Sequence, residues 1–576
     1  MSWLQSYLLK FCSFHDSRCV SKSPVYALFL DARSAFDRVI KEILVRNLFL
    51  AGTDDQRLIY IDNRLANRKT YCQYRNELLG PIHDVRGLEQ GGVSSSDQYK
   101  LYNNEQSDSS QSSGLGVDLG PQNVSCISLA DDAILLSSDI TNLKNLLYLT
   151  VLYCSKYNVD LVPHKTVLLA MNTKCESAAA GRLSSVFLNS KELVFDKEAL
   201  HLGVLRSADC SAGNVPSIID RLTAYRKQLF SLLPAGLALH HGGSPAANLQ
   251  VEKMYCLPVL LSGLSTLVIT AAEMNMITKY HKNVLRQLMK LPVNTPNSAV
   301  YLLAGYLPFP AYLHQRQLIL FSMICHLEGN VIKNHAIYIL TTYSSFVANS
   351  WFHKIRQICL QYGLPHPLQL LNNPLPKSKF KALCRNNIHE YWRQKICEEA
   401  QVPSLNYMCA PYLSLFKPHP IWTSLDGNPY QTKAAVIQAS FLSGKYRTES
   451  VCRFWSKNTE GLCKQNSCKN LKIVEDIRHV LLTCSALECT RRRLANQTLE
   501  VLVSNPIFKP IVDAYLFGSD DDLRLHFLVD CSTLPMIISA YQMFGDIVHK
   551  FMFKISRNWC RSLHRQRLKL LGRHLG

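Results

Sequence analysis

The sequence predicts an α+β fold, with strands and helices mixed in the N-terminal part and helices in the rest. Residues 25–30 form a continuous apolar run, which is typical of a buried strand. Residues 124–130 and 133–137 predict two more strands joined by a tight turn. From about residue 214 onward the spacing of apolar residues is mostly helical.

The remaining elements follow from local patterns along the chain. Residues 36–50 carry apolar side chains at helical spacing, which predicts a helix. Residues 104–123 are polar and rich in Ser, Gly and Asn, which predicts loop and turn. Proline clusters at 292–310, 363–376 and 403–420 are candidate linkers or domain edges.

The composition favours a nucleic-acid partner inside the cell. The chain has 576 residues, 47% of them hydrophobic, so large cores can form. Lys and Arg number 63 against 43 Asp and Glu, and the net charge of +20 favours a polyanion, nucleic acid before membrane. The 20 cysteines are scattered and the start, MSWLQSYLLKF, does not resemble a signal peptide. We therefore expect a protein of the nucleus or cytoplasm that is not secreted.

One apolar stretch has nearly the length of a membrane span. Residues 255–272 contain Pro258, Gly263 and several Ser and Thr, whereas a span needs about 20 apolar residues. A buried pair of helices is therefore favoured over a membrane segment, and no membrane partner is expected.

Three aspartates follow the predicted strands. Asp31 ends the first strand, and Asp131 and Asp132 occupy the turn between the next two. Phosphoryl transfer with two divalent ions about 4 Å apart needs carboxylates that converge from separate strands, and Mg²⁺ prefers such oxygen ligands. If the strands are neighbours in one sheet, these carboxylates meet at its edge. An Asp pair is also common in turns, so the pair alone does not assign the site.

Four segments in order resemble the reverse transcriptases of non-LTR (LINE-type) retrotransposons. They are FLDARSAFD at 29–37, RGLEQGGVSSSDQYKLYN at 86–103, LADDAIL at 129–135 and HLGV at 201–204. The resemblance implies a right-hand polymerase palm, an antiparallel sheet with packed helices, followed by a mostly helical thumb and linker. It also implies an RNA-directed DNA polymerase, a nucleotidyltransferase that uses two Mg²⁺ ions, an RNA template, a DNA primer and dNTPs.

The resemblance assigns roles to side chains of these segments. Asp31, Asp131 and Asp132 correspond to the metal ligands of the catalytic site. Phe36 matches the aromatic gate that excludes a ribose 2′-hydroxyl, although it would equally serve as the first core residue of a helix. Lys165 matches a lysine that protonates the pyrophosphate leaving group, the alternative being a solvated loop lysine.

Two turns supply the substrate-binding and primer-grip residues that the resemblance implies. The first would let the incoming base pair and template approach the backbone closely, because glycine has no Cβ. The second would grip the primer. The first turn contains Gln90, Gly91 and Gly92, and the second contains His201, Leu202 and Gly203.

The sequence also departs from the family pattern. Ser95 and Ser96 stand where the family usually has Ser-Pro, and Leu129 stands where an aromatic residue is common. Only 30 residues precede Asp31, so we expect an N-terminally truncated enzyme without an endonuclease and without complete fingers. A second hypothesis stays open, a catalytically inactive retroelement remnant that binds nucleic acid through its basic surface and a zinc knuckle.

A Cys/His cluster near the C-terminus predicts a structural zinc site. The spacing is C-x4-C-x10-H-x4-C, from Cys463, Cys468, His479 and Cys484, and three thiolates with one imidazole suit tetrahedral zinc. With 20 cysteines in the chain, a fortuitous set is the alternative.

Two groups of arginines are candidate nucleic-acid contacts, with a solvated helix face as the alternative for each. The first group follows the zinc cluster. The second recurs every four residues along a C-terminal helix, and the last 26 residues of the chain contain no acid. The groups are Arg491, Arg492 and Arg493, and then Arg557, Arg561 and Arg565, continued by Lys569 and Arg573.

These patterns give five expected regions. In chain order they are the palm, a thumb-like helical region, a helical linker, the zinc knuckle and a C-terminal helical region with a basic tail. Their expected limits are 1–205, 206–330, 331–450, 451–500 and 501–576.

Overall fold

The computed structural model describes most of the chain, namely residues 24–83, 86–89, 91–119, 122–129, 131–171, 185–201, 204–208, 213–237, 243–327, 330–342, 350–408, 417–453 and 460–572. Of the residues singled out above, Gln90, Leu202, Gly203 and Arg573 lie outside the described residues. The chain forms two compact units of three stretches each. The N-terminal unit is Met1–Arg221, Ser262–Glu273 and His314–Cys384, and the C-terminal unit is Leu222–Leu261, Met274–Leu313 and Arg385–Gly576.

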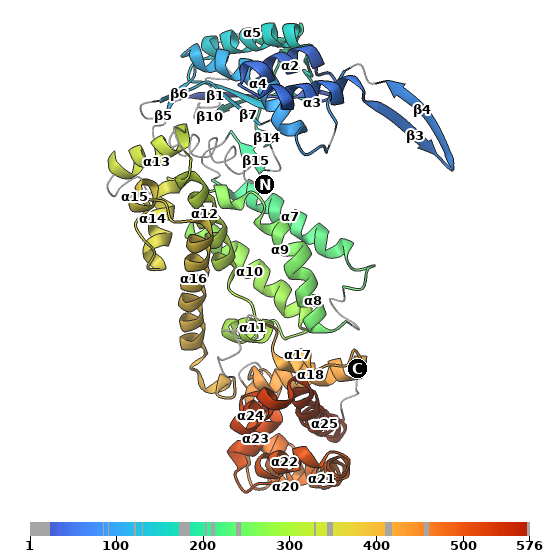
Figure 1. Cartoon of the computed structure of the whole chain (residues 1–576). Coiled ribbons are helices and arrows are strands. Elements are labelled where there is room, and N and C mark those ends of the chain that lie inside the picture. The colour runs from blue at the N-terminus through green and yellow to red at the C-terminus, as the bar shows by residue number, and fades with distance from the viewer. Residues whose placement is uncertain are drawn as a thin grey trace. The chain divides into compact units, whose positions relative to one another are not determined.

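A five-stranded sheet forms the centre of the N-terminal unit (Figure 1). The strand order is β13-β10-β1-β8-β7, and all neighbours are antiparallel except β10 and β13. The three strands predicted from the sequence are confirmed as its middle strand and the adjoining hairpin. The strands are β1 (Val25–Leu30), β7 (Cys126–Leu129), β8 (Asp132–Ser137), β10 (Val167–Met171) and β13 (Phe195–Asp196).

Both faces of the sheet are buried, which explains the continuous apolar run of β1. Tyr26, Leu28 and Leu30 pack with four helices, whereas Ala27 and Phe29 point into a second core on the opposite face. Figure 1 shows the helices lying over one side of the sheet. They are α2 (Lys41–Leu50), α3 (Asp55–Ala66), α4 (Ser95–Ser112) and α5 (Ile140–Tyr157).

Two predictions in this unit are wrong in part. The helix expected at 36–50 begins at Lys41, because the Phe36 and Val39 carbonyls accept hydrogen bonds from a neighbouring loop instead. The segment 104–123 is not all loop. It contains the end of α4 and the short hairpin β5 (Val117–Leu119) and β6 (Gln122–Val124). Helix α4 buries polar side chains beside its two tyrosines, so its sequence shows no apolar periodicity.

Short hairpins surround the central sheet. The β3–β4 hairpin is fully exposed along both strands and projects from its unit (Figure 1). The pairs are β2 (Ala32–Arg33) with β9 (Asp160–Leu161), β3 (Lys69–Tyr74) with β4 (Glu77–His83), β11 (Val186–Leu188) with β12 (Lys191–Leu193), and β14 (Glu198–His201) with β15 (Val204–Ser207).

From residue 215 onward the described chain is helical, as predicted. Of the α-helices that follow residue 215, three lie wholly in the N-terminal unit, namely α13 (Val331–Thr342), α14 (Trp351–Gln361) and α15 (Pro367–Asn372). The others are α7 (Val215–Ser231), α8 (Pro245–Val251), α9 (Leu257–Leu261), α10 (Ala271–Leu288), α11 (Asn297–Ala304), α12 (Phe309–Cys325), α16 (Lys377–Ala400), α17 (Pro420–Thr423), α18 (Pro429–Leu442), α19 (Glu449–Cys452), α20 (Asn466–Lys469), α21 (Glu488–Val503), α22 (Lys509–Tyr515), α23 (Asp521–Asp530), α24 (Pro535–Phe544) and α25 (Asp546–Leu570).

The stretch 255–272 is not one continuous helix. It passes through the end of a π-helix, α9 and a short 3-10 helix, with a break at Gly263, whose φ is 76°. Among the described residues, Asp521–Phe544 has the length and hydropathy of a membrane span, and half of its apolar window is buried. Core helices of soluble proteins share these properties, so this is weak support for a membrane segment.

Candidate active site and candidate metal centre

The strand register brings the predicted carboxylates together. In the β1–β8 pair Leu30 lies opposite Ala133, so the next pair in this register is Asp31 opposite Asp132. Leu129 pairs with Asp132 in the β7–β8 hairpin, so Asp131 lies in the turn beside them. The three carboxylates therefore lie together at the ends of β1, β7 and β8, as the sequence predicted. We call this end of the sheet the acidic edge.

The carboxylates act on one another electrostatically. Desolvation and then the charges of Asp131 and Asp31 raise the pKa of Asp132 to about 6. Desolvation also raises the pKa of Asp131, against a backbone hydrogen bond that lowers it, and the charge of Asp31 adds to the increase. Like charges held this close favour protonation or a bound cation. Oxygen ligands of this kind fit Mg²⁺.

A lysine completes the edge of this site. The backbone N–H of Val162 donates to the carbonyl oxygen of Asp31 at 2.9 Å, and Ala32 pairs with Leu161 across β2 and β9. This pairing brings the following turn to the acidic edge, where the Lys165 Nζ lies 3.6 Å from Asp31 Oδ2. The lysine predicted as a general acid is thus a neighbour of the carboxylates.

Phe36 is part of the same site. Its ring stacks on Tyr99 of α4 with centroids 4.7 Å apart and is partly exposed. Burial and then the nearby Asp131 carboxylate raise the pKa of Tyr99, so this tyrosine links Phe36 to the acidic edge. Sequence reasoning missed Tyr99, although its spacing from Ser95 and Tyr102 on one helix face was a usable signal.

The loop that holds Phe36 depends on a glycine that sequence reasoning also missed. Gly87 has a φ of 89°, and a Cβ there would lie 2.8 Å from the Asp37 carbonyl oxygen. The N–H of Leu88 donates to the Phe36 carbonyl at 2.8 Å. In the glycine turn that follows, Gly91 has a φ of 83°, a backbone conformation that favours glycine.

The hairpin β14–β15 contains His201, the one residue of the predicted primer grip that lies within the described residues. His201 is buried, and its ring lies 5.2 Å from the ring of Phe29, two residues before Asp31. Burial and then the charge of Arg206 lower the pKa of His201 to about 4. The hairpin therefore packs against the strand that carries the first carboxylate.

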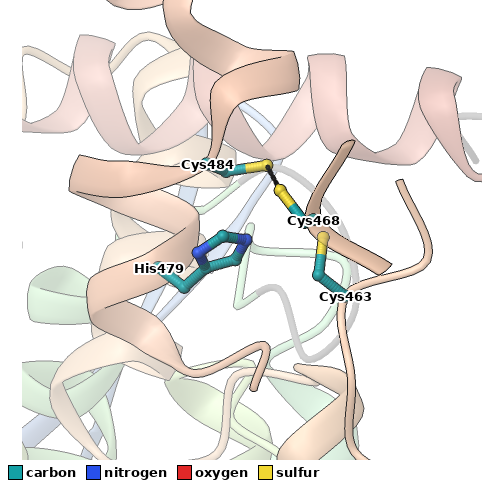
Figure 2. Close-up of side chains that lie close together, drawn as sticks. All are labelled: Cys463, Cys468, His479 and Cys484. Atoms are coloured by element: carbon teal, nitrogen blue, oxygen red, sulfur yellow. Dashed lines mark hydrogen bonds between the residues drawn. The ribbon is translucent and has the colours of Figure 1, made fainter. Parts of the chain in front are cut away.

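The Cys/His cluster forms a compact site in the C-terminal unit. One ligand atom from each of Cys463, Cys468, His479 and Cys484 lies within 4.8 Å of the others, and all four residues are buried. Figure 2 shows the three sulfurs and the imidazole turned toward one another. The Cys468 and Cys484 sulfurs are 3.9 Å apart. Sulfurs that share a tetrahedral zinc at about 2.3 Å lie about 3.8 Å apart.

The donor set of the cluster fits a metal ion. His479 Nδ1 contacts Thr483 Oγ1 at 3.1 Å, whereas the buried Nε2 has no hydrogen-bond partner within the described residues. Burial acts to raise the pKa of Cys468, but hydrogen bonds from Ser485 lower it overall. Burial raises the pKa of Cys463 to about 12, so a metal ion would have to displace a proton there.

The loop that carries the cluster is tied to the C-terminal helix α25. Glu475 accepts two hydrogen bonds from Arg567, at 2.9 and 2.7 Å, and both side chains are 5% exposed. The same carboxylate accepts from the Glu449 N–H at 2.8 Å. The Glu475 N–H donates to the carbonyl of Gly461, two residues before Cys463. A buried ion pair therefore connects the cluster loop, α19 and α25.

The structure divides the two arginine groups. Arg491 and Arg557 are buried, and their donors bond carbonyls of Cys484 and of Ser424 and Phe553, so neither belongs to a solvated helix face. Arg492 pairs with Glu488, and Arg561 lies against an aromatic ring. Arg493 and Arg565 are exposed, as the prediction requires.

Comparison with known proteins finds a similarity in the N-terminal part of the chain. Residues 4–194 match the sequence model of the family described as reverse transcriptase (RNA-dependent DNA polymerase). This region contains the three aspartates, Phe36 and Lys165. None of the curated proteins compared with the chain matches it. The chain thus carries a region similar to a reverse transcriptase domain, a family of nucleotidyltransferases that use divalent metal ions, an RNA template, a DNA primer and dNTPs.

Proposed function

We propose that the chain is the RNA-directed DNA polymerase of a non-LTR retrotransposon and that Asp31, Asp131 and Asp132 hold two Mg²⁺ ions at its active site. The reverse transcriptase match supports the class of reaction. The β1–β8 register, which ends with Leu30 opposite Ala133 and so brings the following Asp31 beside Asp132, is the observation that supports the assignment of the site. Bound Mg²⁺ would lower the pKa of the primer 3′-hydroxyl and neutralise the triphosphate.

The chain's own residues supply positioning and proton transfer. The ring of Phe36, held by its stack on Tyr99, would exclude a ribose 2′-hydroxyl and so select deoxynucleotides. Lys165, whose Nζ is 3.6 Å from Asp31 Oδ2, would give a proton to the pyrophosphate oxygen as its bond to the α-phosphate breaks. The His201 hairpin, packed on Phe29, would hold the primer end beside the carboxylates.

A primer-extension assay tests this proposal. The full chain, a DNA primer on an RNA template, dNTPs and Mg²⁺ should give extended primer, and Asp131→Asn should remove it. Asp97→Asn is a matched control, because Asp97 is exposed on α4 and pairs only with a nearby lysine among the described residues. Equal products from the wild-type chain and Asp131→Asn would exclude polymerase activity and leave nucleic-acid binding as the function.

We assign the Cys/His cluster to structural zinc within the same protein. The unpartnered, buried His479 Nε2 supports a metal ligand there, because a buried nitrogen without a partner is costly. Elemental analysis of the purified chain should find one zinc per chain, and Co²⁺ substitution should give thiolate charge-transfer absorption. The exposed Cys489 provides the control Cys489→Ser. Zinc retained in Cys484→Ser at the wild-type level would contradict the assignment.

A further inference from the structure

A cavity of about 430 Å³ opens in the C-terminal unit where α18 and α21 both pack against α25. Small-molecule sites occupy roughly 300–1,000 Å³. The apolar lining consists of Ala434 of α18, Val501 of α21, and Phe551 and Ile555 of α25. Ala434 and Ile555 are buried, whereas Val501 is 39% exposed. The cavity therefore has an apolar floor and an open side.

The polar lining is basic and contains amides. Lys554 and Arg561 of α25 line the cavity, and neither forms an ion pair within the described residues. Gln497 and Asn558 add side-chain amides, which both donate and accept hydrogen bonds. Glu500 adds one carboxylate that accepts only. The lining can thus meet a phosphate and the hydrogen-bonding edge of a polar ring.

An aromatic ring lies next to the cavity. Tyr430 is the second residue of α18 and immediately precedes Gln431, which is part of the lining, and the Tyr430 side chain is 64% exposed. The guanidinium carbon of Arg561 is 5.5 Å from the centre of this ring. A cation against an exposed ring strengthens a platform on which a planar ligand stacks.

We infer that this cavity binds an unpaired nucleobase of single-stranded RNA together with its adjoining phosphate. The base stacks on Tyr430 and enters the apolar floor, while Arg561 and Lys554 meet the phosphate. Proteins recognise unpaired RNA bases by this combination of stacking, edge contacts and nearby cations. An acidic peptide would use the cations but not the aromatic platform or the amides. The inference rests on the proposed function only in taking RNA as the strand.

Glu500 adds a preference among the bases. A carboxylate accepts hydrogen bonds but cannot donate, so it favours cytosine, which presents an amino group, over uracil, which presents a carbonyl there. The two bases have the same ring size, so they differ mainly in this contact. Oligocytidylate should therefore bind more tightly than oligouridylate, and Glu500→Gln should remove the difference, because an amide both donates and accepts.

Fluorescence anisotropy with the full chain tests the site. The probes are oligocytidylate and oligouridylate RNA of about 12 nucleotides, and an RNA duplex of the same length. Val501→Trp, which fills the open side, and Arg561→Gln should each weaken single-strand binding about tenfold, since one stacked base contributes this much. The matched control is Lys550→Gln, an exposed lysine one turn before Lys554 on the same helix and outside the cavity lining. Free AMP should compete only at far higher concentration than the strand.

Each result is decisive for the cavity. Single-strand affinity that is unchanged in Val501→Trp and Arg561→Gln would overturn the inference, as would equal losses for the duplex or for Lys550→Gln. Displacement of the RNA by a polyglutamate peptide at lower concentration than by oligocytidylate would assign the cavity to an acidic protein partner instead. Crosslinks of 4-thiouridine RNA to α18, α21 or α25 would support it even if a variant folds poorly. Primer extension, assayed separately, reports on the polymerase proposal.

Discussion

The acidic edge of the N-terminal unit and the Cys/His cluster of the C-terminal unit are built in different ways. Asp31 and the Asp131–Asp132 pair are far apart in the chain and meet because β1 and β8 pair in one register. The Cys/His ligands lie within residues 463–484 and gather through a short loop. The acidic edge is partly open to solvent, whereas every ligand residue of the cluster is buried.

The two sites therefore suit different roles in the protein. The fold forms the acidic edge at an electrostatic cost, because burial and then the charges of Asp131 and Asp31 raise the pKa of Asp132. A site that is open to solvent and that forms at an electrostatic cost suits metal ions that exchange and take part in a reaction. The closed cluster, with its orphan His479 nitrogen, suits one permanent ion that contributes to folding. Substitutions at the first site should change activity, and substitutions at the second should change stability.

Asp31→Asn gives the largest expected effect. Primer extension should fall by at least about 10³-fold, roughly 4 kcal/mol in barrier height, because a metal ligand is lost. The free energy of unfolding should not fall, because one of three repelling charges is removed. Loss of stability with unchanged primer extension would show that Asp31 has the structural role expected of the Cys/His cluster instead of a catalytic one.

Cys484→Ser should act in the opposite way. We expect the free energy of unfolding of the C-terminal unit to fall by about 3–4 kcal/mol, since a structural metal ligand is lost. Urea titration followed by brief proteolysis measures this loss, and a chelator should reproduce it in the wild-type chain. Cys489→Ser should have little effect because Cys489 is exposed. A chelator that leaves the urea midpoint unchanged would contradict the assignment of the cluster to structural zinc.

Arg567→Ala tests whether the cluster loop is fastened to α25 by its ion pair. The change leaves Glu475 buried without its partner, which costs about 3 kcal/mol. Arg565→Ala on the same helix removes an exposed charge and should cost less than about 0.5 kcal/mol. The urea midpoints of the two variants check the difference, and equal midpoints would show that the buried pair does not fasten the helix.

The smallest expected effect concerns pH and His201. Its folded-state pKa is lowered from 6.5 to about 4, so protonation favours the unfolded state. Its contribution is complete above pH 6.5 and is lost as the pH falls toward 4, by at most about 3 kcal/mol. His201→Phe should flatten this part of the stability–pH curve, measured by thermal unfolding between those limits. An unchanged slope would place the pH dependence on other groups.

Much of the acidic site could be predicted because strand pairing has local signals. The apolar run of β1 and the Asp131 turn were both visible in the sequence, and pairing the strands brings the carboxylates together. Tyr99 and Gly87 were not found. Tyr99 acts through a ring stack on a residue far away in the chain, and Gly87 matters because the backbone of Asp37 approaches it.

Side-chain burial explains the remaining differences between the sequence predictions and the structure. The polar composition of residues 104–123 predicts loop, although the segment begins inside helix α4. This helix buries polar groups such as Asn103 and Gln106, and apolar spacing cannot reveal such a helix. The arginine stripe of α25 gives no sign that Arg557 turns inward to bond Ser424, whereas Arg565 stays exposed. A helical repeat of charge does not distinguish a solvated side from one that packs against α17.

The central claim, that three aspartates form one divalent metal site, is tested most directly by counting bound Mn²⁺ with electron paramagnetic resonance. The wild-type chain should bind two ions that Mg²⁺ displaces, and Asp31→Asn and Asp131→Asn should each lose them together. Asp97→Asn, an exposed acid outside the site, should keep both. Two ions retained in Asp31→Asn or Asp131→Asn would contradict the claim.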